Sequence, residues 1–209
     1  MARLARSFFS RYTPDVAGDL LGRVLVREVG GSVLTARIVE TEAYRGADDP
    51  ASHSYRGMTK RTTVMFGEAG HAYVYFTYGN HYCLNLTAET EGVPGAVLIR
   101  AVEPLKGIEE MRRRRGVEEL TNLTSGPGKL TKAMGIDLRL NGEDVVKSKE
   151  LFVRDGHRTE EVVVSPRIGI SSGQDKLWRY YLGGNAFVSG ARTHNYRTRE
   201  SGSNRGVVG

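Results

Sequence analysis

The sequence of 209 residues lacks the features that disulfide-bonded, zinc-binding, membrane-spanning and secreted proteins require. It contains a single cysteine, Cys83, which excludes an internal disulfide and a cysteine-based zinc site. No apolar run approaches the roughly 20 residues that a membrane-spanning helix needs. The apolar stretch in the basic start of the chain is too short and too interrupted for a signal peptide. These absences predict a cytoplasmic protein without a membrane partner.

The composition that is present is typical of a globular protein with a basic surface. Hydrophobic residues make up 39% of the chain and charged residues 26%, which is enough to bury a core. The net charge of +6 favours a polyanionic partner. The 26 glycines indicate tight turns between short strands, and the ten tyrosines suit a wet surface that uses both a flat ring and a hydroxyl.

Capping, turn and alternation patterns predict the order of helices and strands along the chain. The expected elements are a helix from Thr13 to Gly22, strands at 23–29 and 33–44 joined by Gly30-Gly31, a long functional loop at 45–70, a hairpin at 71–88, a strand at 96–102, a helix from Glu103-Pro104 to Arg115, a helix within 125–136, and strands within 151–156, 161–170, 177–184 and 186–190. This order predicts a mixed α/β (α+β) fold, with a curved antiparallel β-sheet or partial barrel flanked by helices. Residues 1–190 would form one domain, followed by a polar basic tail at 191–209.

Two carboxylates stand out in the stretch RIVETEAYRG (37–46). Strand side chains alternate, so Glu40 and Glu42 share one face, with their α-carbons about 7 Å apart. That spacing suits the paired carboxylates of an inverting glycosidase, which are about 6.5–9.5 Å apart. The alternative is that one or both bind an arginine such as Arg100. The pattern favours a structural role for Glu40 and leaves both roles open for Glu42.

The tyrosines of YVYFTYGN (73–80) have different environments. Tyr73 and Tyr75 share a strand face, and core packing is favoured for Tyr73. Tyr78 lies at the expected hairpin tip beside Gly79, where no core can bury it. An aromatic ring there can act as a wedge between stacked bases, or it can be an ordinary surface residue.

Other motifs carry less chemistry. SGPGK (125–129) lacks the glycine and the Ser/Thr that a P-loop requires, but backbone N–H groups at a glycine-rich helix start, with Lys129 beside them, can hold a phosphate. A plain helix entry is the alternative. MRRRRG (111–116) is typical of a solvated helix end. The five histidines show no ligand spacing and no GxSxG motif is present, so the sequence predicts neither a metal nor another cofactor, and Cys83 is expected to pack.

Several blocks of the sequence closely resemble one known family. They are VETEAYRGADDPASHSYRGMTKRTTVMFGEAGHAYVYFTYGNHYCLNL (39–86), VLIRAVEPLKGIEEMR (97–112) and SGPGKLTKAMGI (125–136). Their order and spacing resemble the alkyladenine (3-methyladenine) DNA glycosylases, from about Phe8 to residue 190. The resemblance implies a single mixed α/β domain around a curved antiparallel sheet.

The resemblance also implies roles for individual residues. Glu42 matches the general base and Arg100 the arginine beside the catalytic water. The remaining matches are the pocket residues Tyr44, His53, Tyr75 and Asn85, the intercalating Tyr78 and the DNA-contacting Met65. Lys129, from its glycine-rich turn, is added as a DNA-binding candidate.

The expected activity is that of a monofunctional, monomeric DNA glycosylase in base excision repair. It would rotate 3-methyladenine and related alkylated or deaminated purines out of double-stranded DNA and hydrolyse the N-glycosidic bond with a Glu42-activated water. Two alternatives remain, a sugar hydrolase using both carboxylates and a non-catalytic nucleic-acid-binding module. The second leaves Glu42 unexplained, because a carboxylate repels phosphate.

Overall fold

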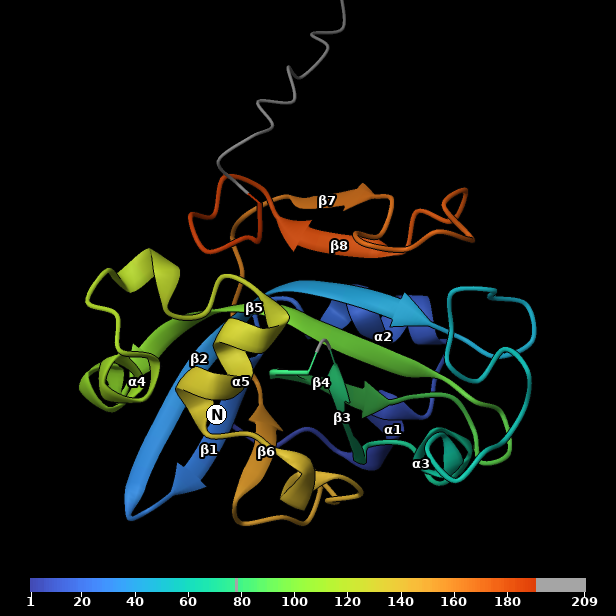
Figure 1. Ribbon diagram of the computed structural model, residues 1–209, viewed down its shortest axis with the longest axis horizontal. Helices are drawn as coiled ribbons and strands as arrows, with labels where there is room; N and C mark the ends of the chain where they lie inside the picture. Colours follow the sequence, from blue (N-terminus) through green and yellow to red (C-terminus); the bar gives the residue numbers. More distant parts are fainter. Residues whose placement is uncertain (78, 191–209) are drawn as a thin grey trace, which may run out of the picture.

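The computed structural model describes residues 1–77 and 79–190. Helices and strands alternate irregularly along the chain (Figure 1). The elements are α1 (Arg6–Phe9), α2 (Thr13–Leu20), β1 (Val24–Val29), β2 (Ser32–Tyr44), α3 (Thr63–Phe66), β3 (Ala72–Thr77), β4 (His81–Thr87), β5 (Ala96–Lys106), α4 (Ile108–Arg115), the 3-10 helix η1 (Leu120–Asn122), α5 (Pro127–Met134), the 3-10 helix η2 (Leu138–Leu140), β6 (Leu151–Arg154), β7 (Val162–Ser165) and β8 (Arg179–Leu182).

The strands form one antiparallel sheet in the order β3-β4-β5-β2-β1-β6, and β8 joins β2 to β7. The long strand β2 pairs with β5 along one side. On its other side it pairs with β1 through residues 32–37 and then with β8 through residues 40–42. The β2–β5 register shifts on both sides of Glu40, where β8 has replaced β1. The curved antiparallel sheet and mixed α/β class are therefore confirmed, and Glu40 and Glu42 lie where the sheet branches.

Helices cover the sheet and leave one face of the branch point for a site. In Figure 1, α2 lies behind the strands and α5 in front of them. Helix α2 packs on β2 and β5 and buries Val16 and Leu20. The Thr41 hydroxyl donates a hydrogen bond to the Ala17 carbonyl of α2, at 2.8 Å. Because side chains alternate along β2, the carboxylates on either side of Thr41 point away from α2.

Two expected elements are wrong. The helix predicted to begin at Glu103-Pro104 begins at Ile108, because β5 continues through Lys106. Proline is tolerated there because Pro104 pairs with Ala36 beside a register shift, where the ladder is already irregular. Gly107, with φ of 79°, then turns the chain into α4.

The strand expected within 186–190 is a run of turns, and the short helices α1 and α3 were not expected. Tyr78 and the tail at 191–209 lie outside the described residues. Among the described residues, no helix is both long and apolar enough to span a bilayer.

Candidate active site

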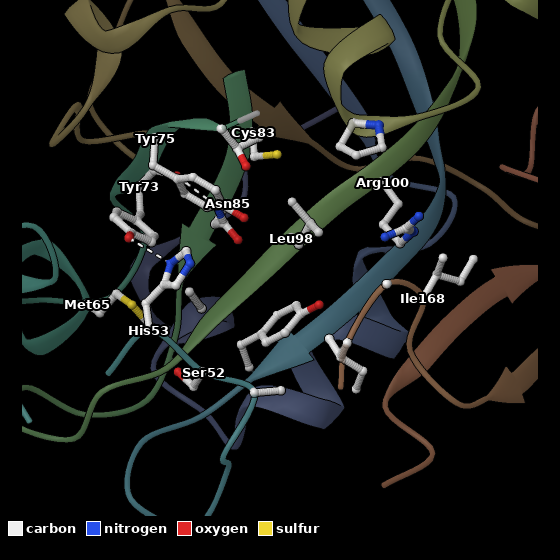
Figure 2. A pocket seen from close by; sticks show the side chains of 17 residues that line it. Ser52, His53, Met65, Tyr73, Tyr75, Cys83, Asn85, Leu98, Arg100 and Ile168 are labelled. Atoms are coloured by element: carbon white, nitrogen blue, oxygen red, sulfur yellow. Dashed lines mark hydrogen bonds between the residues drawn. The ribbon is translucent and has the colours of Figure 1, made fainter. Parts of the chain in front are cut away.

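A cavity of about 380 Å³ opens between the hairpin β3–β4, strand β5 and the segment around Ile168. This volume lies within the range of ligand pockets, about 300–1,000 Å³. In Figure 2, Tyr73, Tyr75 and His53 lie on one side, and Arg100 and Ile168 on the other, with Leu98 between them. Tyr44 and Asn85 also line the cavity. The predicted pocket residues are therefore brought together from β2, the 45–70 loop, β3 and β4.

Three rings form an interlocked aromatic wall. The His53 and Tyr75 ring centroids are 4.7 Å apart with an interplanar angle of 80°, and those of Tyr73 and Tyr75 are 5.4 Å apart. The Arg61 guanidinium lies 4.9 Å from the Tyr75 centroid. Each of these rings is held by others, so the wall offers a preformed aromatic surface to a flat ligand.

His53 is neutral in this wall although its ring faces the open cavity. Partial burial, together with the positive charge of Arg61, lowers the pKa of His53 to about 4. Arg61 lies 3.3 Å from Nε2 and can only donate a hydrogen bond, so Nε2 accepts. Nδ1 then carries the proton and donates to the Tyr73 hydroxyl at 3.0 Å.

Glu42 lies beneath the cavity floor with no exposed side-chain surface. Its Oε2 accepts from the Tyr44 hydroxyl at 2.8 Å and from Arg100 Nη1 at 3.1 Å. Its Oε1 accepts from the backbone N–H of Ile168 at 2.7 Å. A carboxylate has about four acceptor positions, so the three donors leave one on Oε1. A water molecule bound there would be held by an oriented base.

Burial and nearby charges set the protonation states of the groups around Glu42. Burial alone would lower the pKa of Arg100, but Glu42 and Glu40 outweigh it and raise that pKa above its usual value. Burial, and then the charge of Glu42, raise the pKa of Tyr44 well above 10. Arg100 therefore stays cationic and the Tyr44 hydroxyl stays protonated, so both remain donors to Glu42.

Comparisons with known proteins bear on what this site does. The model of the family described as methylpurine-DNA glycosylase matches residues 7–186. The chain belongs to this family. A Carboxydothermus hydrogenoformans protein provisionally named 3-methyladenine DNA glycosylase is 51% identical over 188 residues, 89% of this chain and 98% of its own. Proteins with the same provisional name in Methanocella arvoryzae and Koribacter versatilis are 50% and 47% identical, over 87% and 92% of this chain and 92% and 95% of theirs.

Membership of the methylpurine-DNA glycosylase family confirms the expected enzyme class, a DNA glycosylase of DNA repair. DNA is accordingly the substrate of this class. The site geometry is consistent with such an enzyme, because the wall of a pocket lined by aromatic rings includes an arginine that binds a buried carboxylate.

The arginine partner expected for Glu40 is present. Its side chain has no exposed surface and accepts from Arg100 Nε at 3.1 Å and from Arg179 Nε at 2.7 Å. The backbone N–H and hydroxyl of Ser189 donate to it at 2.6 and 2.9 Å. Oε1 thus accepts from three donors and Oε2 from one, and these contacts hold Arg100 and the turn at Ser189 in place.

The remaining predicted residues lie in different places. Asn85 Nδ2 donates to the Tyr73 carbonyl at 3.0 Å, which fixes the amide at the cavity wall. Met65 of α3 is 1% exposed and lines the cavity. Lys129 lies outside this cavity, where its Nζ donates to Asn122 Oδ1 at 2.6 Å. Burial raises the pKa of the Cys83 thiol at the cavity wall, so the thiol stays protonated.

Sequence reasoning missed two contributors. Tyr73, for which core packing was expected, is buried but also lines the cavity and binds His53. Ile168 contributes through its backbone N–H, which any residue but proline provides, so its side chain gives no signal. The expected alternation had correctly placed Tyr73 on the face of Tyr75.

One group of potential metal ligands occurs in the described part of the chain, at Glu68, His71 and Asp144. Arg6 lies 2.6 Å from Asp144 and 3.3 Å from Glu68, so one guanidinium already pairs with both carboxylates. The group is separate from the cavity lining.

Proposed function

We propose that this protein excises 3-methyladenine and related alkylated or deaminated purines from duplex DNA by hydrolysis of the N-glycosidic bond. The single observation that carries the proposal is the aromatic cavity whose wall includes Arg100, the ion-pair partner of the buried Glu42. The provisional names of the curated relatives support the substrate class.

The damaged nucleotide first leaves the helix. Unstacking costs a few kcal/mol, and less at a damaged pair. The extruded base enters the cavity and stacks on Tyr44 and Tyr75, and stacking on an aromatic ring contributes about 1–3 kcal/mol per base. Alkylation of a ring nitrogen makes the base cationic, and electron-rich rings attract a cation. Tyr78 would fill the vacated space.

Hydrolysis follows with Glu42 as general base. Its remaining acceptor position takes a proton from a water molecule that attacks C1′ of the sugar. Arg100 orients the carboxylate, and the negative charge stabilises the oxocarbenium-like transition state. The three residues that donate to Glu42, namely Tyr44, Arg100 and Ile168, all line the cavity. A cationic base needs little acid assistance to leave.

The alternatives fit less well. A sugar hydrolase that uses both carboxylates needs an available acid or base at Glu40, whose side chain has no exposed surface and is held by two arginines and Ser189. A non-catalytic binding module gives no reason to hold Glu42 with three donors beneath a cavity.

Duplexes with one hypoxanthine or one 1,N6-ethenoadenine test this function, with an undamaged duplex as control. The native protein should generate alkali-labile abasic sites only at the lesion. No strand should break before alkali, and no borohydride-trapped adduct should form, because no Schiff base is involved. Sedimentation of the protein should give the mass of a monomer. Absence of abasic sites with these duplexes and with a methylated duplex would refute the proposal.

A further inference from the structure

Arg167 and Asp49 form an ion pair whose side chains have no exposed surface. Arg167 Nη1 and Nη2 each lie 2.7 Å from one carboxylate oxygen, in the two-pronged geometry that fits guanidinium to carboxylate. The pair joins two segments 118 residues apart, the loop that carries His53 and the segment that carries Ile168. Neither side chain lines the cavity.

The same guanidinium reaches the strand that carries the proposed base. Arg167 Nη1 also donates to the carbonyl of Ala43 at 2.9 Å, between Glu42 and Tyr44. The guanidinium carbon lies 4.7 Å from the Tyr44 ring centroid. Tyr44 lines the cavity and the buried Arg167 does not, so the guanidinium contacts the ring from the side away from the cavity.

We propose that Arg167, held by Asp49, is a positioning residue that fixes Glu42 for attack on the glycosidic bond; this inference rests on the function proposed above. The residue after Arg167 is Ile168, whose N–H donates to Glu42 Oε1 at 2.7 Å. By anchoring this segment to Ala43, Arg167 sets the direction of that N–H. By contacting the Tyr44 ring, it also supports the hydroxyl that donates to Oε2.

Stability alone is a poor reason for such a pair. The desolvation of two buried charges offsets much of their attraction, and apolar residues of similar volume often replace a buried pair without loss of stability. Arg167 Nε, moreover, is buried with no hydrogen-bond partner among the described residues. An unpartnered buried N–H destabilises the fold, so the guanidinium is better explained by the geometry it imposes on Glu42.

The test uses the double variant Arg167→Met/Asp49→Leu, which leaves no buried unpaired charge. With enzyme in excess over a hypoxanthine duplex, its single-turnover rate should fall about 10- to 100-fold, because small misplacement of a catalytic group has effects of this size. Its affinity for a duplex carrying a tetrahydrofuran abasic analogue should stay within about twofold of native, since positioning affects the chemical step. The reaction amplitude should be unchanged.

The matched control is Arg37→Met, which removes an arginine paired with Glu103 and Glu160 on the same strand β2. Position 37 lies about 16 Å along the strand from Glu42, so the native rate is expected. If the double variant does not fold, Arg167→Lys tests the positioning role instead, because lysine keeps the charge but loses the two-pronged contact with Asp49. It should show the same slower rate with native amplitude.

The outcomes separate the two proposals. A native protein inactive on every lesion duplex would refute the proposed function. An active native protein, with the folded variant reacting at the native rate, would refute the positioning role alone. A lower amplitude at the native rate would also contradict positioning, because that is the result of partial unfolding.

Discussion

The change Glu40→Gln separates the two neighbouring carboxylates most clearly. Glutamine keeps the size and one acceptor oxygen of Glu40 but replaces the other oxygen with an NH₂ group. That group would face Arg100, Arg179 or the N–H and hydroxyl of Ser189, which all act as donors to Glu40. The substitution therefore removes a buried charge and creates a clash between donors.

The expected cost follows from these contacts. Glu40 has no exposed side-chain surface, and its arginine partners are only 10% and 11% exposed. Breaking a buried ion pair from one side costs about 3–5 kcal/mol. The matched control Glu103→Gln affects a carboxylate that is 27% exposed and should cost at most about 1 kcal/mol. The glycosidase alternative instead gives Glu40 a catalytic effect as large as that of Glu42.

Urea unfolding and single-turnover kinetics on a hypoxanthine duplex measure the two effects. The free energy of unfolding should fall by about 3–5 kcal/mol at an unchanged urea dependence. The rate of the folded fraction should fall less than about tenfold, since Glu40 acts only through Arg100. Unchanged stability, or a rate loss equal to that of Glu42→Gln, would refute this reasoning.

Two further predictions concern the aromatic wall. By NMR, His53 should titrate near pH 4 instead of its ordinary 6.5, because burial and Arg61 disfavour the cation. Between these values the unfolded chain binds a proton that the folded chain does not, so the free energy of unfolding falls as pH drops from 6.5 to 4. His53→Gln should remove the contribution of His53 to this fall. A titration midpoint near 6.5 would contradict the prediction. In a Glu42→Gln background, Tyr75→Ala should weaken binding to an ethenoadenine duplex by about 1–3 kcal/mol, and Tyr75→Phe, which keeps the ring, should not. Fluorescence anisotropy measures the affinity of the two Tyr75 variants. Equal losses of affinity in Tyr75→Ala and Tyr75→Phe would exclude stacking.

Short stretches of the sequence correctly predicted the turns and strand faces that depend on neighbouring residues alone. Gly30 and Gly31 both adopt positive φ, at 58° and 75°, and join β1 to β2 as expected. Alternation put Glu40 and Glu42 on one face and Tyr73 with Tyr75 on another. The helix predicted to begin at Glu103-Pro104 was wrong because proline is tolerated both at a helix start and at an irregular strand position. Only the pairing of Pro104 with Ala36 distinguishes the two.

No short stretch of the sequence predicted the contacts in the site between residues that are distant along the chain. The surroundings of the two carboxylates differ because Arg179 and Ser189, more than 130 residues later, donate to the carboxylate of Glu40. Arg167 and Asp49 are likewise distant in sequence. Family resemblance supplied the identities of the pocket residues, whereas the burial of Glu42 beneath Tyr44 and Ile168 depends on packing that no short stretch encodes.

The role of Glu42 as general base is tested by the release of free hypoxanthine from a lesion duplex by the native protein and by Glu42→Gln, under single-turnover conditions and detected by mass spectrometry. We expect stoichiometric release by the native protein and a rate about 10²- to 10⁴-fold lower for the variant, the usual effect of a lost general base. Binding to a tetrahydrofuran duplex controls for folding. Release by a folded Glu42→Gln at close to the native rate would show that Glu42 is not the general base.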